Sequence, residues 1–238
     1  MSRLQLTAML KHRENYTPPA FLVASADLDI NIYDNETIVT TKLAIAPNPN
    51  AVKSTVLQLD GRALQLKSVS VDGVQLNDDE FELDDNCLYI RGLTGRHSVE
   101  TITQCNPETN TALEGLYLSG GMYCTQCEPE GFRRIGYFPD RPDVMAVFTV
   151  RIEANERFLQ LLSNGNLVET GDCKNGRHFA IWHDPHPKPS YLFAAVAGDL
   201  DCAVDHFVTM SGRKVDLRIY VEKGNVELTH HAMASLKR

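Results

Sequence analysis

One stretch of the chain gathers residue types that are able to do chemistry. Between Tyr123 and Asp143 the sequence reads YCTQCEPEGFRRIGYFPDRPD, which holds two cysteines, a Gln-x-Glu pair, adjacent arginines and three prolines. Most of the remaining chain has the pattern of strands and turns, so we expect this stretch to form a loop. Loops held by a rigid scaffold commonly carry binding and catalytic residues. We therefore take it as the candidate functional site.

The Gln126-x-Glu128 pair has the geometry of a receptor for an ammonium group. If the chain is extended from Cys124 to Glu128, Gln126 and Glu128 project from one face and Cys127 points away. Pro129 favours an extended conformation at Glu128, because proline restricts the residue before it. The carboxylate supplies charge, and the carboxamide oxygen accepts a second hydrogen bond.

A second interpretation gives Glu128 a structural part only. Arg133 and Arg134 follow a few residues later, and an ion pair with either of them would tie the loop down. Charge pairs of this kind are common on protein surfaces and contribute little to stability. The residue types alone favour this structural interpretation over the ammonium receptor, although they exclude neither.

The Cys124-x-x-Cys127 pair suggests half of a zinc site or a redox pair. A zinc site needs two further ligands, and the sequence has no second Cys-x-x-Cys. A thioredoxin-like pair lies at a strand-to-helix junction, whereas the surroundings here predict strands. We expect two ordinary thiols in a packed loop.

Other catalytic patterns are absent from the sequence. It has no His-Glu-x-x-His, no G-x-S-x-G elbow, no P-loop and no G-x-G-x-x-G. His183 and His186 flank a proline, which rules out a helical pair of metal ligands, and we expect them to be surface turn residues. On its own chemistry the chain lacks a catalytic apparatus, although Glu128 is able to bind a cation.

Composition and charge limit the class of protein. The chain has 238 residues, of which 43% are hydrophobic and 23% charged, enough for one large β domain or two smaller ones. The net charge of −8 argues against nucleic acid and against an anionic membrane surface. No apolar run approaches transmembrane length, and the N-terminal segment MSRLQLTAMLKHRENY has no secretory signal pattern. With six cysteines and no export signal, we expect reduced thiols in a cytoplasm.

The pattern along the rest of the chain is that of short strands separated by turns. Residues 20–34 and 37–47 alternate and predict a hairpin about Asp34-Asn35-Glu36, and further strands are expected at 54–61, 97–104, 144–154 and 177–184. The remaining turn signals predict hairpins about Asp72-Gly73, Asp84-Asp85-Asn86, Asn164-Gly165 and Ser211-Gly212.

Three further local predictions follow from residue types. Pro185, Pro187 and Pro189 should stop the strand that contains Trp182, and residues 190–200 should form a strand buried on both faces. Asn110-Thr111 is predicted to cap a short helical turn. With no long helical period, the chain is predicted to be all-β, either a sandwich or open curved sheets.

The C-terminal segment differs from the rest. A hairpin is followed by residues 226–238, VELTHHAMASLKR, which contain good helix formers but too few residues for a packed helix. Two strands and a helix cut at its first turns resemble the opening of a second domain. We therefore predict a domain at residues 1–198 and the start of another at 199–238.

The sequence resembles the N-terminal domain of the bacterial aminopeptidase N family, the zinc-dependent gluzincin aminopeptidases. The resemblance runs nearly from end to end and is carried by four blocks, Asn110–Val144, Leu161–Asn166, Gly176–Asp199 and Ser211–Asn225. It implies curved, saddle-like antiparallel and mixed sheets, followed from about Asp199 by the first strands of a thermolysin-like catalytic domain.

The resemblance also implies a role for the Gln-x-Glu pair. In that family the glutamate at the position of Glu128 helps to hold the free α-ammonium of a peptide substrate, and the glutamine at the position of Gln126 lines the same first subsite. It therefore favours the ammonium receptor over the structural ion pair. The implied partners are the N-terminus of a peptide and the further domains of the same chain.

The departures from the family pattern are equally informative. The family's Gly-x-Met-Glu-Asn motif, its zinc-binding His-Glu-x-x-His and its transition-state tyrosine do not occur in this sequence. The resemblance thus implies a fragment of a zinc metalloaminopeptidase whose zinc ligands lie elsewhere, and we expect this chain alone to be inactive and to bind no stoichiometric zinc. The alternative is a self-standing β-sandwich module that binds a partner through residues 123–134.

Overall fold

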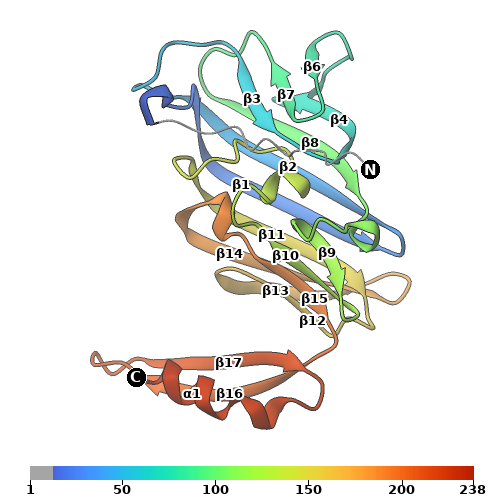
Figure 1. Cartoon of the computed structure of the whole chain (residues 1–238), viewed down its shortest axis with the longest axis vertical. Coiled ribbons are helices and arrows are strands. Elements are labelled where there is room, and N and C mark those ends of the chain that lie inside the picture. The colour runs from blue at the N-terminus through green and yellow to red at the C-terminus, as the bar shows by residue number, and fades with distance from the viewer. Residues whose placement is uncertain (1–12) are drawn as a thin grey trace, which may run out of the picture.

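Strands make up most of residues 13–238, the part of the chain that the computed structural model describes (Figure 1). Residues 1–12 lie outside the described part. They belong to the N-terminal segment that was predicted to lack a secretory signal. The described part has one α-helix, α1 (His230–Leu236), and the 3-10 turns η1 (Arg13–Asn15), η2 (Pro107–Thr109), η3 (Phe132–Arg134), η4 (Ser190–Leu192) and η5 (Val226–Thr229). None of its helices is long and apolar enough to cross a membrane.

The largest sheet has eight strands. In spatial order they are β13 (Asn166–Cys173), β14 (Arg177–Pro189), β11 (Met145–Asn155), β1 (Phe21–Tyr33), β2 (Glu36–Pro47), β8 (His97–Cys105), β4 (Gln65–Val71) and β5 (Val74–Gln75). Neighbours are antiparallel except for β1 and β11, which run parallel with Leu28 opposite Val150 and Ile30 opposite Ile152. Every second residue of these two central strands is buried, because alternate side chains point to one face.

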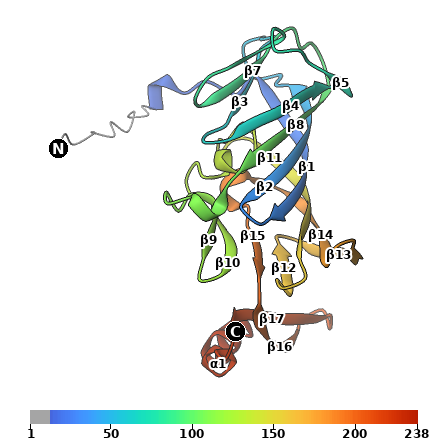
Figure 2. The ribbon, with the colours of Figure 1, turned by 90° about the vertical axis from the view of Figure 1, so that its right-hand side faces the viewer.

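Three smaller sheets complete the described part. The first has the order β12 (Gln160–Ser163), β15 (Ala195–Gly198), β10 (Met122–Gln126) and β9 (Gly115–Ser119); the second has the order β3 (Leu57–Asp60), β7 (Cys87–Ile90) and β6 (Phe81–Leu83); and the third is the hairpin of β16 (Leu200–Val208) and β17 (Lys214–Glu222). Figure 2 shows how the twisted eight-stranded sheet is flanked by β9 and β10. The prediction of an all-β fold with curved antiparallel and mixed sheets is confirmed.

An aromatic cluster joins the large sheet to the candidate loop. The ring centroid of Phe132 in η3 lies 5.3 Å from that of Phe138, 6.0 Å from that of Phe148 on β11 and 5.2 Å from that of Phe193. All four rings are buried. Edge-to-face pairs at such distances add about 0.5–1.5 kcal/mol each beyond the burial of area. The loop is therefore anchored at its C-terminal end by the core.

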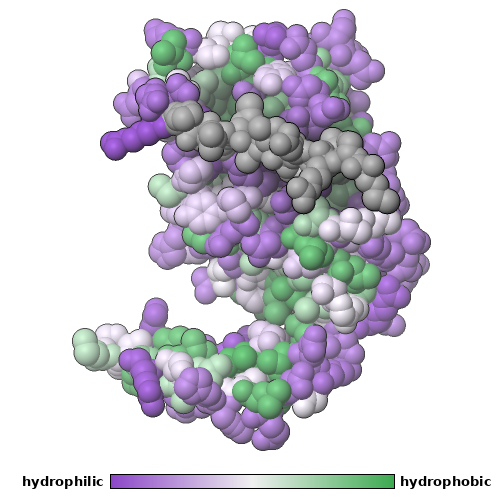
Figure 3. Space-filling view, in the orientation of Figure 1, coloured by the Kyte–Doolittle hydropathy of each residue, from purple (hydrophilic) through white to green (hydrophobic). Residues whose placement is uncertain are grey.

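The β16–β17 hairpin and α1 lie at one end of the molecule, apart from the other sheets (Figures 1 and 2). The predicted turn near Ser211-Gly212 and the predicted C-terminal helix are both confirmed. Lys237, just after α1, forms an ion pair with Asp205 of β16. Apolar residues gather on the hairpin surface in Figure 3, and Val204 and Val208 are exposed there. The domain boundary at residue 198 stays a prediction.

The hairpin predicted about Asn164-Gly165 is wrong. β12 before this turn pairs with β15, while β13 after it pairs with β14, so the two strands belong to different sheets. The side chain of Asn164 accepts a hydrogen bond from Ala194 N at 2.7 Å and donates one to Leu192 O at 3.1 Å. These contacts tie the turn to Leu192 and Ala194, which lead into β15, the strand that pairs with β12.

The prediction that the prolines stop the strand after Trp182 is also wrong. β14 continues to Pro189 and stays paired with β11 beyond a register shift between Ala146 and Phe148. Its pairing with β13 covers Arg177 to His183 and ends there, so the later part of β14, which holds the prolines, has a neighbour on one side only. An edge strand tolerates proline, since the missing N–H would face away from the partner strand.

Two smaller predictions need correction. The helical turn expected near Asn110-Thr111 is instead η2, which Asn106 caps by accepting bonds from Glu108 N and Thr109 N, and Asn110 is the residue that ends it. The apolar run 190–200 is not one strand buried on both faces, since it opens with η4 and the short β15 follows. Ala194 is exposed between the buried residues Phe193 and Ala195, so only alternate residues are covered.

Candidate functional site

The candidate loop begins where β10 ends. Gln126 is the last residue of the strand, and Gln126 and Glu128 are both exposed while Cys127 between them is buried. The alternation predicted from the sequence is therefore present, although the strand does not extend to Glu128 and a turn places this residue. Gln126 Nε2 donates a hydrogen bond of 3.1 Å to the backbone carbonyl of Glu128, which ties the two residues together.

The structure gives the two arginines partners other than Glu128. Arg133 Nε lies 3.0 Å from Asp140 Oδ2, and Arg134 Nε lies 2.9 Å from Glu114 Oε2. Within residues 13–238 the carboxylate of Glu128 takes part in no ion pair and no side-chain hydrogen bond. The structural interpretation, in which Glu128 pairs with Arg133 or Arg134, is therefore wrong for this conformation.

Close backbone packing holds the loop in shape. A Cβ atom on Gly131 would lie 2.3 Å from the carbonyl oxygen of Gln126 and 2.9 Å from Cys127 Cα, so the position accepts only glycine. Gly131 N also donates to Cys127 O at 3.0 Å, which closes a turn around Pro129. Phe132 then enters the aromatic cluster of the core. The loop is thus fixed on both sides of Glu128.

A buried polar group lies under the loop. Asp140 is 4% exposed, and its backbone N–H donates to Asp60 Oδ2 at 2.9 Å. Burial raises the pKa of the Asp60 carboxyl, and the charge of Arg133 opposes this shift. The Asp140 carboxylate receives the side chain of Arg133, so the positive charge beneath the loop is balanced within the protein.

Of the two cysteines, Cys124 lies on β10 and is half-buried, and Cys127 lies in the loop and is buried. Both are free, and Cys127 is 3% exposed. Burial raises the pKa of the Cys127 thiol, and the nearby negative charge of Asp140 adds to the shift. Among residues 13–238 there is no group of three or more His, Cys, Asp and Glu side chains arranged to hold a metal ion. The prediction that His183 and His186 are surface turn residues is wrong, because both lie within β14; His183 is half-buried, and its Nδ1 lies 3.1 Å from Thr149 Oγ1.

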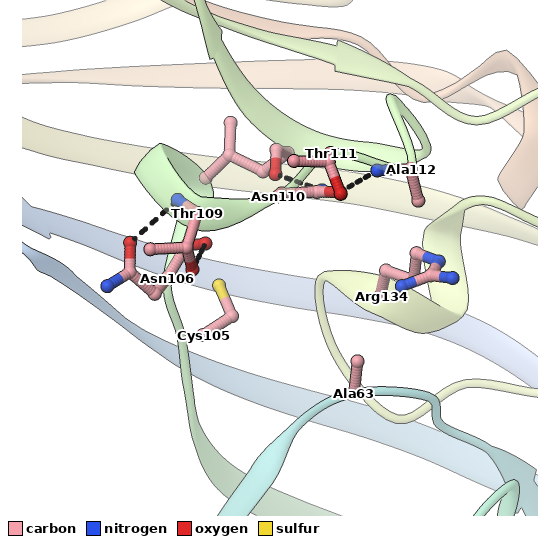
Figure 4. Close-up of a pocket in the computed structure, with 9 residues that line it drawn as sticks. Ala63, Cys105, Asn106, Thr109, Asn110, Thr111, Ala112 and Arg134 are labelled. Atoms are coloured by element: carbon pink, nitrogen blue, oxygen red, sulfur yellow. Dashed lines mark hydrogen bonds between the residues drawn. The ribbon is translucent and has the colours of Figure 1, made fainter.

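A cavity of about 310 Å³ lies beside Arg134 of η3 (Figure 4). Arg134 and Cys105 line it together with Ala63, Asn106, Thr109, Asn110, Thr111, Ala112 and Leu116. Asn110 Nδ2 donates to Glu114 O at 2.8 Å and to Leu116 O at 2.9 Å, and the Asn106 carboxamide oxygen caps η2. Since these polar groups are engaged inside the protein, we do not place the candidate site in this cavity.

The sequence analysis missed two residues that shape the site, Asp140 and Ser190. Ser190 Oγ donates a hydrogen bond of 2.5 Å to Asp140 Oδ1, and both residues are buried. Asp140 lies inside the stretch chosen from the sequence, and Ser190 follows the last proline of β14. The three regularly spaced prolines before Ser190 were the available signal, because they rigidify the segment that delivers it.

The chain belongs to the peptidase M1 family, of which it carries the N-terminal domain. The family profile described as Peptidase M1 N-terminal domain matches residues 14–192. The chain is 46% identical to aminopeptidase N of Caulobacter vibrioides over 94% of its length and 43% identical to that of Escherichia coli over 95%. The match spans 26% of each relative, so the chain corresponds to about a quarter of these proteins. The resemblance seen in the sequence is confirmed.

Solved structures agree with this assignment. The crystal structure of Legionella pneumophila aminopeptidase A in complex with aspartic acid superposes with a TM-score of 0.91 at 34% identity, over 95% of this chain and 27% of that one. An M1 zinc metallopeptidase mutant from Deinococcus radiodurans, bound to a Tyr-Ser-Ala substrate, gives a TM-score of 0.73 at 16% identity over 87% of this chain and 49% of that one. The second likeness concerns the fold alone.

Proposed function

We propose that this chain is the N-terminal part of an aminopeptidase that releases N-terminal amino acids from peptides, and that Glu128 and Gln126 receive the free α-ammonium of the substrate. The observation that carries the proposal is the state of Glu128. Its carboxylate is exposed and unpaired within residues 13–238, at the tip of a loop that glycine packing and the aromatic core hold in place. A charge so held, with no internal partner, is available to a cationic ligand.

The chemistry of the pair fits a primary ammonium group. Such a group has three N–H donors; the Glu128 carboxylate accepts one or two of them, and Gln126 retains its carboxamide oxygen while its nitrogen donates to Glu128 O. A charged hydrogen bond of this type contributes about 1.5–3 kcal/mol. Because a blocked N-terminus carries no charge, the pair selects free N-termini and positions the first peptide bond at a constant distance.

Zinc in this proposal belongs to a longer protein. The Deinococcus radiodurans relative is described as a zinc metallopeptidase, but residues 13–238 of this chain present no cluster that fits the ion. The ligands would therefore come from outside residues 13–238, and these residues would contribute to the reaction by binding the substrate. By the same argument we expect the 238-residue chain alone to be inactive.

We place the protein in a reducing compartment, with peptide breakdown in the cytoplasm as its setting. All six cysteines are free, including the buried Cys87 and Cys127. Free thiols of this kind are typical of cytoplasmic proteins. The alternative of a self-standing binding module is less favoured, because the relatives that match the chain along its length are about four times longer.

A chimera tests the proposal. This chain replaces the matching part of Caulobacter vibrioides aminopeptidase N, and Glu128→Gln is compared with Glu169→Gln, which changes an exposed glutamate on β13. The readout is the amine preference. We define it as the inhibition constant of the des-amino analogue of leucine hydroxamate divided by the inhibition constant of leucine hydroxamate. We expect Glu128→Gln to lower this preference about 10–100-fold, as the loss of one charged hydrogen bond requires. Equal preferences in the two variants would refute the proposal.

A further inference from the structure

Asp140 is the most heavily bonded buried carboxylate beneath the candidate loop. Its Oδ2 accepts from Arg133 Nε at 3.0 Å and from Arg133 N at 3.2 Å, and its Oδ1 accepts from Ser190 Oγ at 2.5 Å. Its backbone carbonyl accepts a further bond of 3.1 Å from Arg133 Nη2. The side chain is 2% exposed. A buried carboxylate with this many donors holds each of them in a fixed direction.

Arg133 connects Asp140 to the candidate loop. Its backbone N–H and its guanidinium bind the same carboxylate, so both its main chain and its side chain are oriented by Asp140. Its Nη1 lies 3.6 Å from Glu130 Oε2. Glu130 adopts a left-handed conformation with φ of 65°, which a residue with a side chain adopts only when its surroundings enforce it. Glu128 and Glu130 lie in the same turn, which the hydrogen bond of 3.0 Å from Gly131 N to Cys127 O closes, so a change of conformation at Glu130 reaches Glu128 through that turn.

The Ser190–Asp140 bond joins two of the four sequence blocks that carry the family resemblance. Asp140 lies in the first and longest of them, and Ser190 lies in the proline-rich block that ends β14. The two residues are 50 positions apart. The ammonium receptor itself uses only Gln126 and Glu128, so it does not explain why a buried serine, a buried carboxylate and a half-buried arginine are assembled behind it.

We propose that Asp140 is a positioning residue for the candidate site: through Arg133 it fixes the conformation of residues 127–134 and thereby the direction of the Glu128 carboxylate. Asp140 touches no substrate in this arrangement. The inference rests on the proposed function, since positioning of Glu128 matters for catalysis only if Glu128 receives the ammonium group.

The carboxylate is required because the groups that bond to its two oxygens are all donors. Arg133 presents two N–H groups to one oxygen, and Ser190 presents its hydroxyl to the other. A carboxylate accepts at both oxygens and carries the charge that pairs with Arg133. An amide has no charge, and its NH2 group can only donate, so the bond with Ser190 Oγ would have to reverse. Asp140→Asn therefore removes the ion pair and the Ser190-to-Asp140 hydrogen bond with almost no change in volume.

The test uses the chimera described above, with the amine preference as the readout. Asp140→Asn and Arg133→Lys, which keeps the charge but loses the forked geometry, are compared with Glu128→Gln. The matched control is Arg141→Lys, because Arg141 forms an ion pair of similar kind with Asp143, at 2.7 Å, and donates to Thr17 O. In parallel, amide hydrogen exchange of residues 127–134 is measured in the 238-residue chain, and Ser190→Ala serves as the milder variant if Asp140→Asn fails to fold.

We expect Asp140→Asn and Arg133→Lys each to lower the amine preference about tenfold, as a small displacement of a binding group does. In the Glu128→Gln background the same substitutions should have no further effect, because they act through Glu128. In these two variants the rate of amide hydrogen exchange should rise in residues 127–134. The amine preference of Arg141→Lys should equal that of the unsubstituted chimera.

The outcomes separate the two proposals. If Glu128→Gln lowers the amine preference but Asp140→Asn, Ser190→Ala and Arg133→Lys leave it unchanged, the positioning role is overturned and the ammonium receptor stands. If Glu128→Gln leaves the preference unchanged, the proposed function fails and the positioning role fails with it. Effects of Arg133→Lys that persist in full in the Glu128→Gln background would also overturn the positioning role, since they would show that Arg133 does not act through Glu128.

Discussion

Gln126 donates its carboxamide N–H to the backbone carbonyl of Glu128 across 3.1 Å, so one half of the candidate receptor holds the other in place. The bond fixes the rotation of the carboxamide and leaves its oxygen on the side away from the donated hydrogen. The bond also gives the Glu128 carbonyl a hydrogen-bond partner. This carbonyl lies in the turn that follows β10, where strand pairing no longer supplies one. The two side chains are therefore one preorganised unit rather than two independent contacts.

The first prediction concerns this bond. Gln126→Glu keeps the shape of the side chain but replaces the N–H donor with an acceptor that faces the Glu128 carbonyl, and it places a second negative charge beside Glu128. We expect a loss of about 1 kcal/mol in the free energy of unfolding, the usual contribution of one hydrogen bond. Urea denaturation of the 238-residue chain measures it. Gln75→Glu, on the edge strand β5, is the control, and equal losses in both would contradict the prediction.

The second prediction concerns Gly131, whose Cβ position is occupied by the carbonyl of Gln126. Its φ is −84°, so alanine meets no backbone strain there and the obstacle is space alone. We expect Gly131→Ala to destabilise the chain by about 1–3 kcal/mol, the cost of overpacking. Hydrogen exchange should rise within residues 127–134.

Gly73→Ala provides the comparison for Gly131→Ala. Gly73 has φ of 80° with no atom within 4 Å of its Cβ position, so its substitution costs only backbone strain, about 1–2 kcal/mol. We expect it to lower stability without changing exchange in residues 127–134. If Gly131→Ala lowers stability no more than Gly73→Ala and leaves the exchange of the loop unchanged, the tight packing of Gly131 does not hold the loop.

Features set by neighbours in sequence were predictable, and features set by distant residues were not. The hairpin at Asp72-Gly73 forms as expected, because its turn chemistry is local. Asn164-Gly165 has the same local signal, but its side-chain partners Leu192 and Ala194 lie 28 and 30 positions away and convert the turn into a crossing between sheets. No local pattern carries that information.

The same division applies to the candidate site. The alternation of Gln126, Cys127 and Glu128 was readable from the sequence, because the end of a strand and a following proline decide it locally. The pairing of Arg133 was not readable, since four acidic residues lie within the stretch from Tyr123 to Asp143 and the choice of Asp140 depends on burial by η4. Burial of a charge is a property of tertiary packing.

The third prediction concerns a pair of buried threonines on the inner face of the large sheet. Thr41 on β2 lies opposite Thr101 on β8, both are at most 1% exposed, and neither hydroxyl has a hydrogen-bond partner among residues 13–238. Burial of an unbonded hydroxyl costs about 1–3 kcal/mol. We therefore expect Thr41→Val and Thr101→Val to stabilise the chain, with a rise of about 2–4 °C in the melting temperature for each kcal/mol gained.

Thr103 is the matched control for these substitutions. It lies on the same strand and is equally buried, but its hydroxyl donates to Val39 O at 3.3 Å. Thr103→Val removes a hydrogen bond that is made, so we expect no gain in stability. Calorimetric melting of the three variants decides the matter, and a gain for Thr103→Val equal to the others would show that the missing partners of Thr41 and Thr101 are not the cause.

The last prediction concerns the pH dependence of stability at Glu153 on β11. Arg177 Nε and Arg151 Nη2 donate to its two oxygens at 2.7 and 2.5 Å. Burial alone would raise the pKa of this carboxyl, but the bonds from Arg177, Arg151 and Cys173 outweigh it and lower the pKa from 4.5 to about 2. The folded protein therefore binds the Glu153 proton less readily than the unfolded chain does.

The sign of the effect follows from linkage. Because the pKa is lower in the folded state, Glu153 stabilises the protein fully above about pH 4.5, and this contribution disappears as the pH falls towards 2. The difference in unfolding free energy between the natural chain and Glu153→Gln should thus be largest near neutral pH and shrink between pH 4.5 and 2. Arg177→Met should shift this loss to higher pH, since it removes one of the bonds that lower the pKa. Urea denaturation at a series of pH values measures both, and a difference that stays constant across this range would mean that the arginines do not hold the Glu153 charge in the folded state.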